Sequence, residues 1–327
     1  MKNILILATG GTIASVKTDE GLRPAYKPQE MIDLIPELKD IANLEGKLIM
    51  NIDSSDMVPE RWIEIADSID KNKDSYDGIV VLHGTDTMSY TSSALSLMLK
   101  GIDKPIVITG AMKGIGEEGS DAIGNMINAV KFATEEYNGI YCVFDSKVYQ
   151  GSRISKVNPS SVNAFENINS SLVGEFKKGE FNKDVDYNSS LEDLVYEKDT
   201  KISDEVYYMY LTPGMKTDII DKVLELGYKG IVIGGYGDGN FPLRFLDKFE
   251  EVLDKNIPLV LGSQCLKGKV DAAYEAGFKL MKKGAISAKD MTNEMAVTKL
   301  MYAIGHSDNL EKIKEIMSEN YANEISE

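Results

Sequence analysis

Residues 4–14 read Ile-Leu-Ile-Leu-Ala-Thr-Gly-Gly-Thr-Ile-Ala, and this stretch decides the fold class. The apolar run at 4–7 is short and rich in branched side chains, which is typical of a buried β-strand. The two glycines that follow permit a turn, or a close approach to a ligand, that a Cβ would forbid. Ligands of open α/β sheets bind at this end of the strands, so Thr12 is a candidate nucleophile. From these residues alone, a threonine that only caps a turn or a helix is the alternative.

The same order of apolar strand, turn and helix recurs along the first half of the chain. The apolar runs predict further strands at 47–52, 78–82, 105–108 and 139–144. Helices with an apolar stripe follow the first three of these runs. The single tryptophan, Trp62, lies on such a stripe and is expected in the core. This alternation predicts an α/β fold with a mainly parallel sheet.

A polar segment divides the chain. Residues from about 177 to 205 are rich in Asp, Glu, Lys and Asn and show no sustained apolar period. We therefore expect a larger N-terminal domain at 1–180, a linker at 181–205 and a smaller, doubly wound α/β domain at 206–327. The glycine cluster at 234–240 in the smaller domain lacks the G-x-G-x-x-G spacing of dinucleotide-binding loops.

Composition excludes several classes of function. The formal net charge of -16 over 327 residues disfavours nucleic acid, which is bound through clustered Lys and Arg. Two distant cysteines and two histidines supply neither a disulfide framework nor a metal site, and no phosphate-binding or zinc-protease motif occurs. A strand begins at once, with no signal-peptide pattern, and no apolar run approaches the roughly 20 residues that cross a bilayer. We expect a cytoplasmic protein without cofactor, metal or membrane partner.

Hydroxyl groups concentrate at the predicted strand ends, next to carboxylates. An unactivated threonine hydroxyl attacks a carbonyl only if another group removes its proton and donors hold the resulting oxyanion. The hydroxyl groups at these turns belong to Thr12, Ser54, Ser55, Thr85 and Thr87. The neighbouring carboxylates belong to Asp53, Asp56 and Asp86.

Four motifs, spread over the N-terminal half, resemble the bacterial-type L-asparaginase family in its cytoplasmic type I branch. They are Thr-Gly-Gly-Thr-Ile-Ala at 9–14, Asp-Ser-Ser-Asp-Met at 53–57, His-Gly-Thr-Asp-Thr at 83–87 and Ser-Lys at 155–156. The resemblance extends over essentially the whole chain. It implies an amidohydrolase that converts L-asparagine to L-aspartate and ammonia through a threonine nucleophile.

The resemblance also implies a role for each matched residue. Thr12 matches the nucleophile, and Thr85, Asp86 and Lys156 match a second group that activates water or the nucleophile. Ser54 would hold the α-carboxylate of the substrate and Asp86 its α-ammonium. Asp53 and Ser55 flank Ser54 and are further candidates for substrate binding. The backbone N–H groups of Thr12 and Thr85 are candidate oxyanion donors, because a glycine precedes each.

Two questions about proton transfer stay open at this level. Lys156 must be neutral to accept a proton, whereas a neighbouring Asp86 favours the ammonium, so Lys156 is either a desolvated base or a fixed cation. Family members commonly place a tyrosine after the glycine of a lid segment, hydrogen-bonded to the first threonine, where this chain has Leu22. Tyr26 is the candidate substitute. His83, at a strand end, is expected to be structural.

The segment at 17–29 contains a glycine and two prolines and is expected to lack regular structure. It is either a lid over the substrate or a variable surface loop.

Several alternatives for function remain. Asparagine and glutamine differ by one methylene, worth about 1–3 kcal/mol in pocket fit, so a mixed asparaginase/glutaminase is open. A non-catalytic amino-acid sensor would not need all of Thr12, Thr85, Asp86 and Lys156. The asparaginase-like subunit of a tRNA-dependent amidotransferase usually carries an extra N-terminal domain, which is not expected here. Family members form homodimers or homotetramers, and some have a second, regulatory asparagine site.

Overall fold

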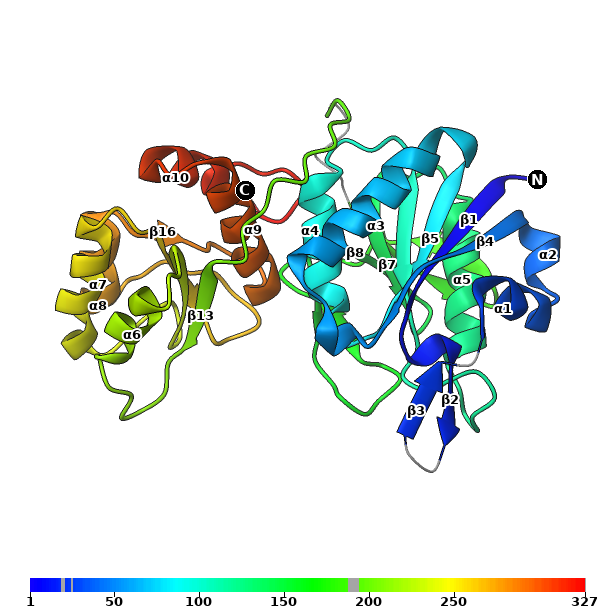
Figure 1. Ribbon diagram of the computed structural model, residues 1–327, viewed down its shortest axis with the longest axis horizontal. Coiled ribbons are helices and arrows are strands. Elements are labelled where there is room, and N and C mark those ends of the chain that lie inside the picture. Colours follow the sequence, from blue (N-terminus) through cyan, green and yellow to red (C-terminus); the bar gives the residue numbers. More distant parts are fainter. Residues whose placement is uncertain (19–20, 25, 188–193, 327) are drawn as a thin grey trace. The chain divides into compact units, whose positions relative to one another are not determined.

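The computed structural model describes residues 1–18, 21–24, 26–187 and 194–326 (Figure 1). The chain divides into two compact units, Met1–Thr200 and Lys201–Glu327. Each unit contains its own sheet and its own hydrophobic core. The expected α/β fold with a larger and a smaller domain is confirmed.

The larger unit is built on an eight-stranded sheet in the order β12-β11-β8-β7-β6-β5-β1-β4. The five strands from β7 to β4 are parallel and the other three are antiparallel. The parallel strands are β1 (Asn3–Gly10), β4 (Asn43–Ile52), β5 (Gly78–Leu82), β6 (Pro105–Thr109) and β7 (Gly139–Phe144). The antiparallel strands are β8 (Lys147–Gln150), β11 (Gly174–Lys177) and β12 (Glu180–Lys183).

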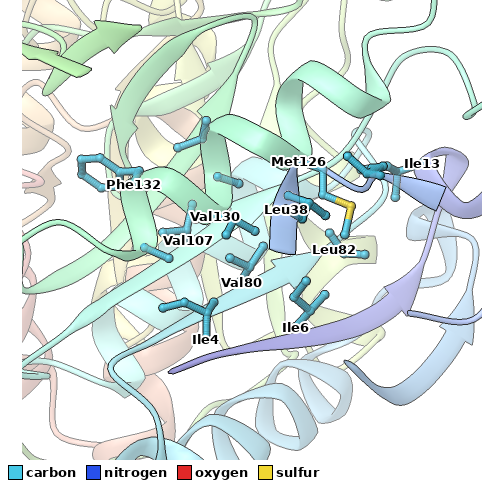
Figure 2. Close-up of a cluster of buried hydrophobic side chains, with 14 of the residues drawn as sticks. Ile4, Ile6, Ile13, Leu38, Val80, Leu82, Val107, Met126, Val130 and Phe132 are labelled. Atoms are coloured by element: carbon cyan, nitrogen blue, oxygen red, sulfur yellow. The ribbon is translucent and has the colours of Figure 1, made fainter. Parts of the chain in front are cut away.

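Helices cover both faces of this sheet, because alternate residues of its buried strands face opposite sides. Ile4 and Ile6 of β1 lie in a cluster with residues from α1 (Pro28–Leu34), α2 (Leu38–Ile41) and α5 (Ala122–Ala133). Figure 2 shows this cluster. On the other side lie α3 (Pro59–Asn72) and α4 (Met88–Met98), where Trp62 is buried as expected (Figure 1).

The prediction that 17–29 lacks regular structure is wrong. Strand β2 (Ser15–Thr18) pairs antiparallel with β3 (Gly21–Pro24), and α1 begins at Pro28. A proline is tolerated at the end of a strand in a two-stranded ribbon, and at the first position of a helix its missing N–H costs nothing. Residues 19, 20 and 25 of the predicted lid lie outside the described residues.

The polar segment after residue 177 begins as regular structure. Lys178 and Gly179, both with positive φ, form the two-residue turn between β11 and β12. Residues 188–193 of the predicted linker lie outside the described residues. Beyond them, Tyr196 donates to Asp70 at 2.7 Å and Lys198 to Asp67 at 3.0 Å, so this part of the segment is attached to α3.

The smaller unit has a four-stranded parallel sheet in the order β13-β14-β15-β16. Its strands are β13 (Val206–Tyr210), β14 (Gly230–Gly235), β15 (Leu259–Ser263) and β16 (Ile286–Ser287). Its helices are α6 (Ile219–Glu225), α7 (Leu246–Asp254), α8 (Glu275–Lys283), α9 (Asn293–His306) and α10 (Leu310–Ser318). Figure 1 shows α7 and α8 on one face of the sheet and α9 on the other, as the doubly wound prediction requires.

Several short elements lie outside the two main sheets and the α-helices. Two short strands, β9 (Ile154–Lys156) and β10 (Phe165–Asn167), form a separate antiparallel pair in the larger unit. Single 3₁₀ turns lie at Thr12–Ala14, Ser54–Asp56, Lys73–Ser75 and Leu243–Phe245. Within the described ranges, every helix is too short or too polar to traverse a lipid bilayer.

Candidate active site

Three loops meet at one edge of the large sheet. They follow β1, β4 and β5, which are neighbouring parallel strands, so their carboxyl ends lie side by side. The first loop carries Thr12, the second Asp53, Ser54 and Ser55, and the third His83, Thr85 and Asp86. The sheet order therefore brings together residues that are far apart in the sequence.

Glycines allow these loops to touch through their backbones. Gly11 has a φ of +88°, and a Cβ on it would lie 2.6 Å from the Gly84 nitrogen. A Cβ on Gly84 would lie 2.5 Å from the Ser54 Oγ. Gly10, with a φ of +111°, packs equally closely on the backbone of Ile52. Larger residues at these positions would separate the loops, so the glycines hold Thr12, Ser54 and Thr85 in one region.

Thr12 opens a 3₁₀ turn and is half-buried. The next residue, Ile13, is fully buried in the same cluster as Leu82 and Met126, which Figure 2 shows around it. The core thus anchors the turn from one side and Gly11 anchors it from the other. Among the residues that the structure describes, none forms a hydrogen bond with the Thr12 hydroxyl.

Lys156 joins the third loop from a distant strand. Its Nζ donates to the Thr85 hydroxyl oxygen at 2.8 Å and to the Asp86 carboxylate at 2.6 Å. The Lys156 side chain is 17% exposed and that of Asp86 is 66% exposed. Thr85 is buried. The predicted grouping of Thr85, Asp86 and Lys156 is therefore present as direct contacts, with one carboxylate oxygen of Asp86 facing the lysine and the side chain open to solvent.

Ser54 is buried and is held in place from two directions. Its backbone oxygen accepts a hydrogen bond from the Thr87 hydroxyl at 2.7 Å. The neighbouring Asp53 carboxylate accepts from the backbone N–H and the hydroxyl of Ser55, each at 2.8 Å. These two donations hold the pKa of Asp53 below its ordinary value. Asp53 and Ser55 thus bind each other and shape the turn that presents Ser54.

His83 is fully buried and forms two hydrogen bonds. Its Nδ1 lies 2.7 Å from the Gly84 carbonyl oxygen, and its Nε2 lies 2.9 Å from the Thr91 hydroxyl. That hydroxyl also accepts from the indole nitrogen of Trp62 at 3.0 Å. Burial lowers the pKa of His83 from 6.5 to about 4, so the ring is neutral near pH 7. The ring is thus part of the buried framework beneath the loop, and its structural role remains a prediction.

Tyr26 lies just before α1 and is half-buried. It packs against the hydrophobic cluster of the larger unit, beside residues of the helices on that face. Within the described part of the chain its hydroxyl has no hydrogen bond to Thr12. Its role in proton transfer remains a prediction.

The sequence alone indicates no specific role for two supporting residues, Thr87 and Thr91. Thr87 is one hydroxyl among several at a strand end. Thr91 lies inside α4, where a threonine carries no signal of its own, and its bonds to His83 and Trp62 depend on how α3 and α4 pack.

Comparison with known proteins agrees with this geometry. Residues 3–189 match the family described as "Asparaginase, N-terminal", and residues 205–317 match "Glutaminase/Asparaginase C-terminal domain". The chain is 39% identical to the L-asparaginase of Thermococcus kodakarensis, over 99% of each chain. It is 37% identical to a subunit of the glutamyl-tRNA(Gln) amidotransferase of Pyrococcus abyssi, over 100% of this chain and 77% of that protein.

Two solved structures extend the comparison. The thermostable L-asparaginase from Thermococcus kodakarensis superposes with a TM-score of 0.92 at 38% identity, covering 99% of each chain. L-asparaginase I from Vibrio cholerae superposes with a TM-score of 0.89 at 29% identity, again covering 99% of each chain. The resemblance seen in the four motifs is confirmed along the whole chain. The protein thus belongs to the asparaginase family and is an amidohydrolase.

Proposed function

We propose that this protein is an L-asparaginase, which hydrolyses the side-chain amide of L-asparagine to L-aspartate and ammonia. The observation that carries the proposal is the contact of Lys156 with both Thr85 and Asp86, beside the loop that presents Thr12. A pocket that only binds an amino acid needs a carboxylate anchor and an ammonium anchor. It does not need a buried threonine hydroxyl bonded to a lysine.

In the proposed reaction the Thr12 hydroxyl oxygen attacks the side-chain amide carbon of asparagine. The C–N bond then breaks, the nitrogen leaves as ammonia after gaining a proton, and an aspartyl ester of Thr12 remains. Water hydrolyses this ester, which releases aspartate and restores the hydroxyl. The backbone N–H groups of Thr12 and Thr85 hold the negative charge that develops on the amide oxygen.

We assign Lys156 the role of a fixed cation. Its 2.6 Å contact with the Asp86 carboxylate has the length of a charge-assisted hydrogen bond. Because Lys156 donates to the Thr85 hydroxyl oxygen, the proton of that hydroxyl is free to bond elsewhere. Thr85 can then orient the attacking water or give a proton to the leaving nitrogen.

We propose that Asp86 and Ser54 bind the two charged groups of the substrate's backbone end. The exposed Asp86 carboxylate can accept the α-ammonium of asparagine while it also holds Lys156. The buried Ser54 hydroxyl can donate to the α-carboxylate of the substrate. Asp53 and Ser55 support the turn at Ser54 through their mutual hydrogen bonds.

The names of the relatives favour a second candidate as well. Several similar proteins are named as a subunit of a glutamyl-tRNA(Gln) amidotransferase, and the second matched family includes glutaminases by name. A chain of this family can therefore act on an amide in a larger assembly, or on glutamine as well as asparagine. We propose asparagine as the preferred substrate and a homodimer or homotetramer as the working form.

One assay separates these candidates. Ammonia release by the purified full chain is measured over a concentration series of L-asparagine and of L-glutamine, and the mass of the assembly is measured in the same buffer. We expect release from asparagine with a higher kcat/KM than from glutamine. Equal values for the two amides would indicate the mixed enzyme, and a sigmoidal asparagine curve would indicate a regulatory site. No release from either amide would contradict the proposal and favour a sensor or an amidotransferase component.

A further inference from the structure

We infer that His83 is a positioning residue, which aims the backbone N–H of Thr85 through its hydrogen bond to the Gly84 carbonyl oxygen. Buried hydrogen bonds from Trp62 to Thr91 and from Thr91 to His83 hold the ring on its other side. The inference rests on the proposed function, in which this N–H binds the oxyanion. It assigns a task to the histidine of the third loop, although the ring itself lies beneath the site and is fully buried.

The groups at the two ends of this series of hydrogen bonds determine which atom donates in each bond. The Trp62 indole nitrogen can only donate, so Thr91 accepts from it at 3.0 Å. The Gly84 carbonyl oxygen can only accept, so the His83 Nδ1 at 2.7 Å must carry a proton. In the neutral ring Nε2 is then an acceptor, and it receives the Thr91 hydroxyl proton at 2.9 Å. Every group in the chain is satisfied by one tautomer, with the proton on Nδ1.

The last bond of this chain determines where the Thr85 N–H points. The Gly84 carbonyl and the Thr85 N–H belong to one peptide unit, which is planar and trans. In such a unit the C=O and N–H bonds point in opposite directions. His83 holds the oxygen toward the buried side, so the N–H faces away from the ring. Among the residues that the structure describes, none accepts a hydrogen bond from this N–H.

The hydrogen bond from His83 matters because the backbone of Gly84 is otherwise free to rotate. Gly84 has no side chain to restrict its backbone, and it lies between the Gly11 backbone and Ser54. Without the bond from His83, the peptide between Gly84 and Thr85 could rotate and carry the N–H away from the oxyanion. A donor that is already aimed costs no reorganisation during the reaction, which is the source of its catalytic effect.

Two substitutions at position 83 distinguish the contribution of Nδ1 from that of Nε2. The amide of an asparagine occupies the place of Nδ1, so His83→Asn keeps a donor for the Gly84 carbonyl. The longer His83→Gln puts its amide near the place of Nε2 and loses that donor. Thr91→Val is the control for a general disturbance of the core. It removes the hydrogen bond between Thr91 and the His83 Nε2 but leaves the bond between His83 and the Gly84 carbonyl oxygen.

Asparagine turnover tests the inference. We expect His83→Gln to lower kcat by about 100-fold with KM changed less than about threefold, because the lost interaction exists only in the transition state. His83→Asn should retain most of the turnover, and Thr91→Val should lose stability more than turnover. A His83→Gln enzyme with near-normal kcat overturns the inference, and so does an equal loss of kcat in both position-83 variants.

A second measurement stands apart from activity. The chain has two histidines, so the ring nitrogens can be assigned in a ¹⁵N-labelled protein by comparison with His306→Gln. We expect a neutral His83 with its proton on Nδ1 from pH 5 to pH 8, and a proton on Nε2 would overturn the inference. If the wild type releases no ammonia, the proposed function fails, whereas this spectrum still decides whether His83 holds the Gly84 carbonyl.

Discussion

Lys156 donates a hydrogen bond to the Thr85 hydroxyl at 2.8 Å, across 71 positions of sequence. The bond joins the loop after β5 to the short strand β9, which pairs with β10 in a sheet separate from the main one. A lysine at the end of a two-stranded pair is thereby held beside a threonine at the edge of the main sheet. In the proposed mechanism this contact orients the Thr85 hydroxyl for proton transfer.

Replacing the lysine should therefore stop turnover and leave the fold intact. We expect Lys156→Met to lower kcat by about 10²–10⁴-fold, which is the range for loss of a group that handles or orients a proton. Lys39→Met on α2 is the matched control, since Lys39 forms an exposed pair with Asp33 of α1 at 3.0 Å. Steady-state ammonia release by both variants checks this, and near-normal turnover in Lys156→Met would remove it from the mechanism.

Adding one methyl group to Gly84 should weaken substrate binding. A Cβ there would lie 2.5 Å from the Ser54 Oγ and 2.6 Å from its Cβ, so the carboxylate anchor must move. We expect Gly84→Ala to raise KM for asparagine and to lower kcat/KM. Gly124→Ala on α5 is the control, because nothing lies within 4 Å of its added Cβ. Equal kinetic constants in the two variants would mean that the contact is without consequence.

His83 should make the larger unit less stable in acid. Burial lowers its folded pKa from 6.5 to about 4, so between these values the unfolded state binds a proton that the folded state excludes. Stability is therefore lost as the pH falls through this window, by about 3 kcal/mol in total for this shift. Urea unfolding followed by the fluorescence of the single tryptophan, Trp62, reports on this unit.

The comparison with His83→Asn isolates this histidine from the carboxylates that also titrate in acid. We expect the wild type to lose more unfolding free energy than the variant between pH 7 and pH 4.5. Parallel losses in the two proteins would show that His83 is not buried as a neutral ring.

The smaller unit contains a fully buried ion pair, and removing one partner of it should destabilise this unit. Lys299 and Glu324 are both 0% exposed and lie 2.6 Å apart, and burial lowers the pKa of Lys299. The Glu324 carboxylate also accepts from the backbone of Tyr321 and Ala322. Removing its charge leaves the buried Lys299 ammonium with the Glu319 carbonyl oxygen but without a counter-charge, which costs about 3–5 kcal/mol.

We expect Glu324→Gln to lower the thermal unfolding temperature of the smaller unit clearly. The exposed pair of Lys312 and Glu315, at 2.9 Å, provides the control, because such surface pairs contribute about 0–1 kcal/mol. Calorimetry of Glu324→Gln and Glu315→Gln makes the comparison, and equal shifts would contradict the expected role of burial.

The sequence predicted the parallel strands well, because continuous apolar runs such as 78–82 identify buried strands directly. It missed the β2–β3 hairpin, whose residues show no apolar alternation, and the β11–β12 hairpin, whose turn depends on two residues with positive φ. Motif resemblance identified Thr85, Asp86 and Lys156 as a group. Their contact could not be derived from local patterns, because it requires the strand that carries Lys156 to return to the sheet edge.

Local sequence patterns could not predict the hydrogen bonds beneath the site either. The bonds from Trp62 to Thr91 and from Thr91 to His83 connect α3, α4 and the end of β5, and they exist only after these elements pack. The helical periodicity predicts that Trp62 lies in the core. Periodicity does not indicate which hydroxyl accepts the hydrogen bond from the indole nitrogen.

The most direct test of the central claim is the turnover of asparagine by Thr12→Ala, measured together with asparagine binding by calorimetry. Thr12→Ser is the matched control, because it keeps a hydroxyl at the same atom position. We expect Thr12→Ala to bind asparagine and to release ammonia more slowly by on the order of 10⁴-fold, whereas Thr12→Ser keeps measurable turnover. Ammonia release by Thr12→Ala at a rate near that of the wild type would contradict the claim that Thr12 is the nucleophile.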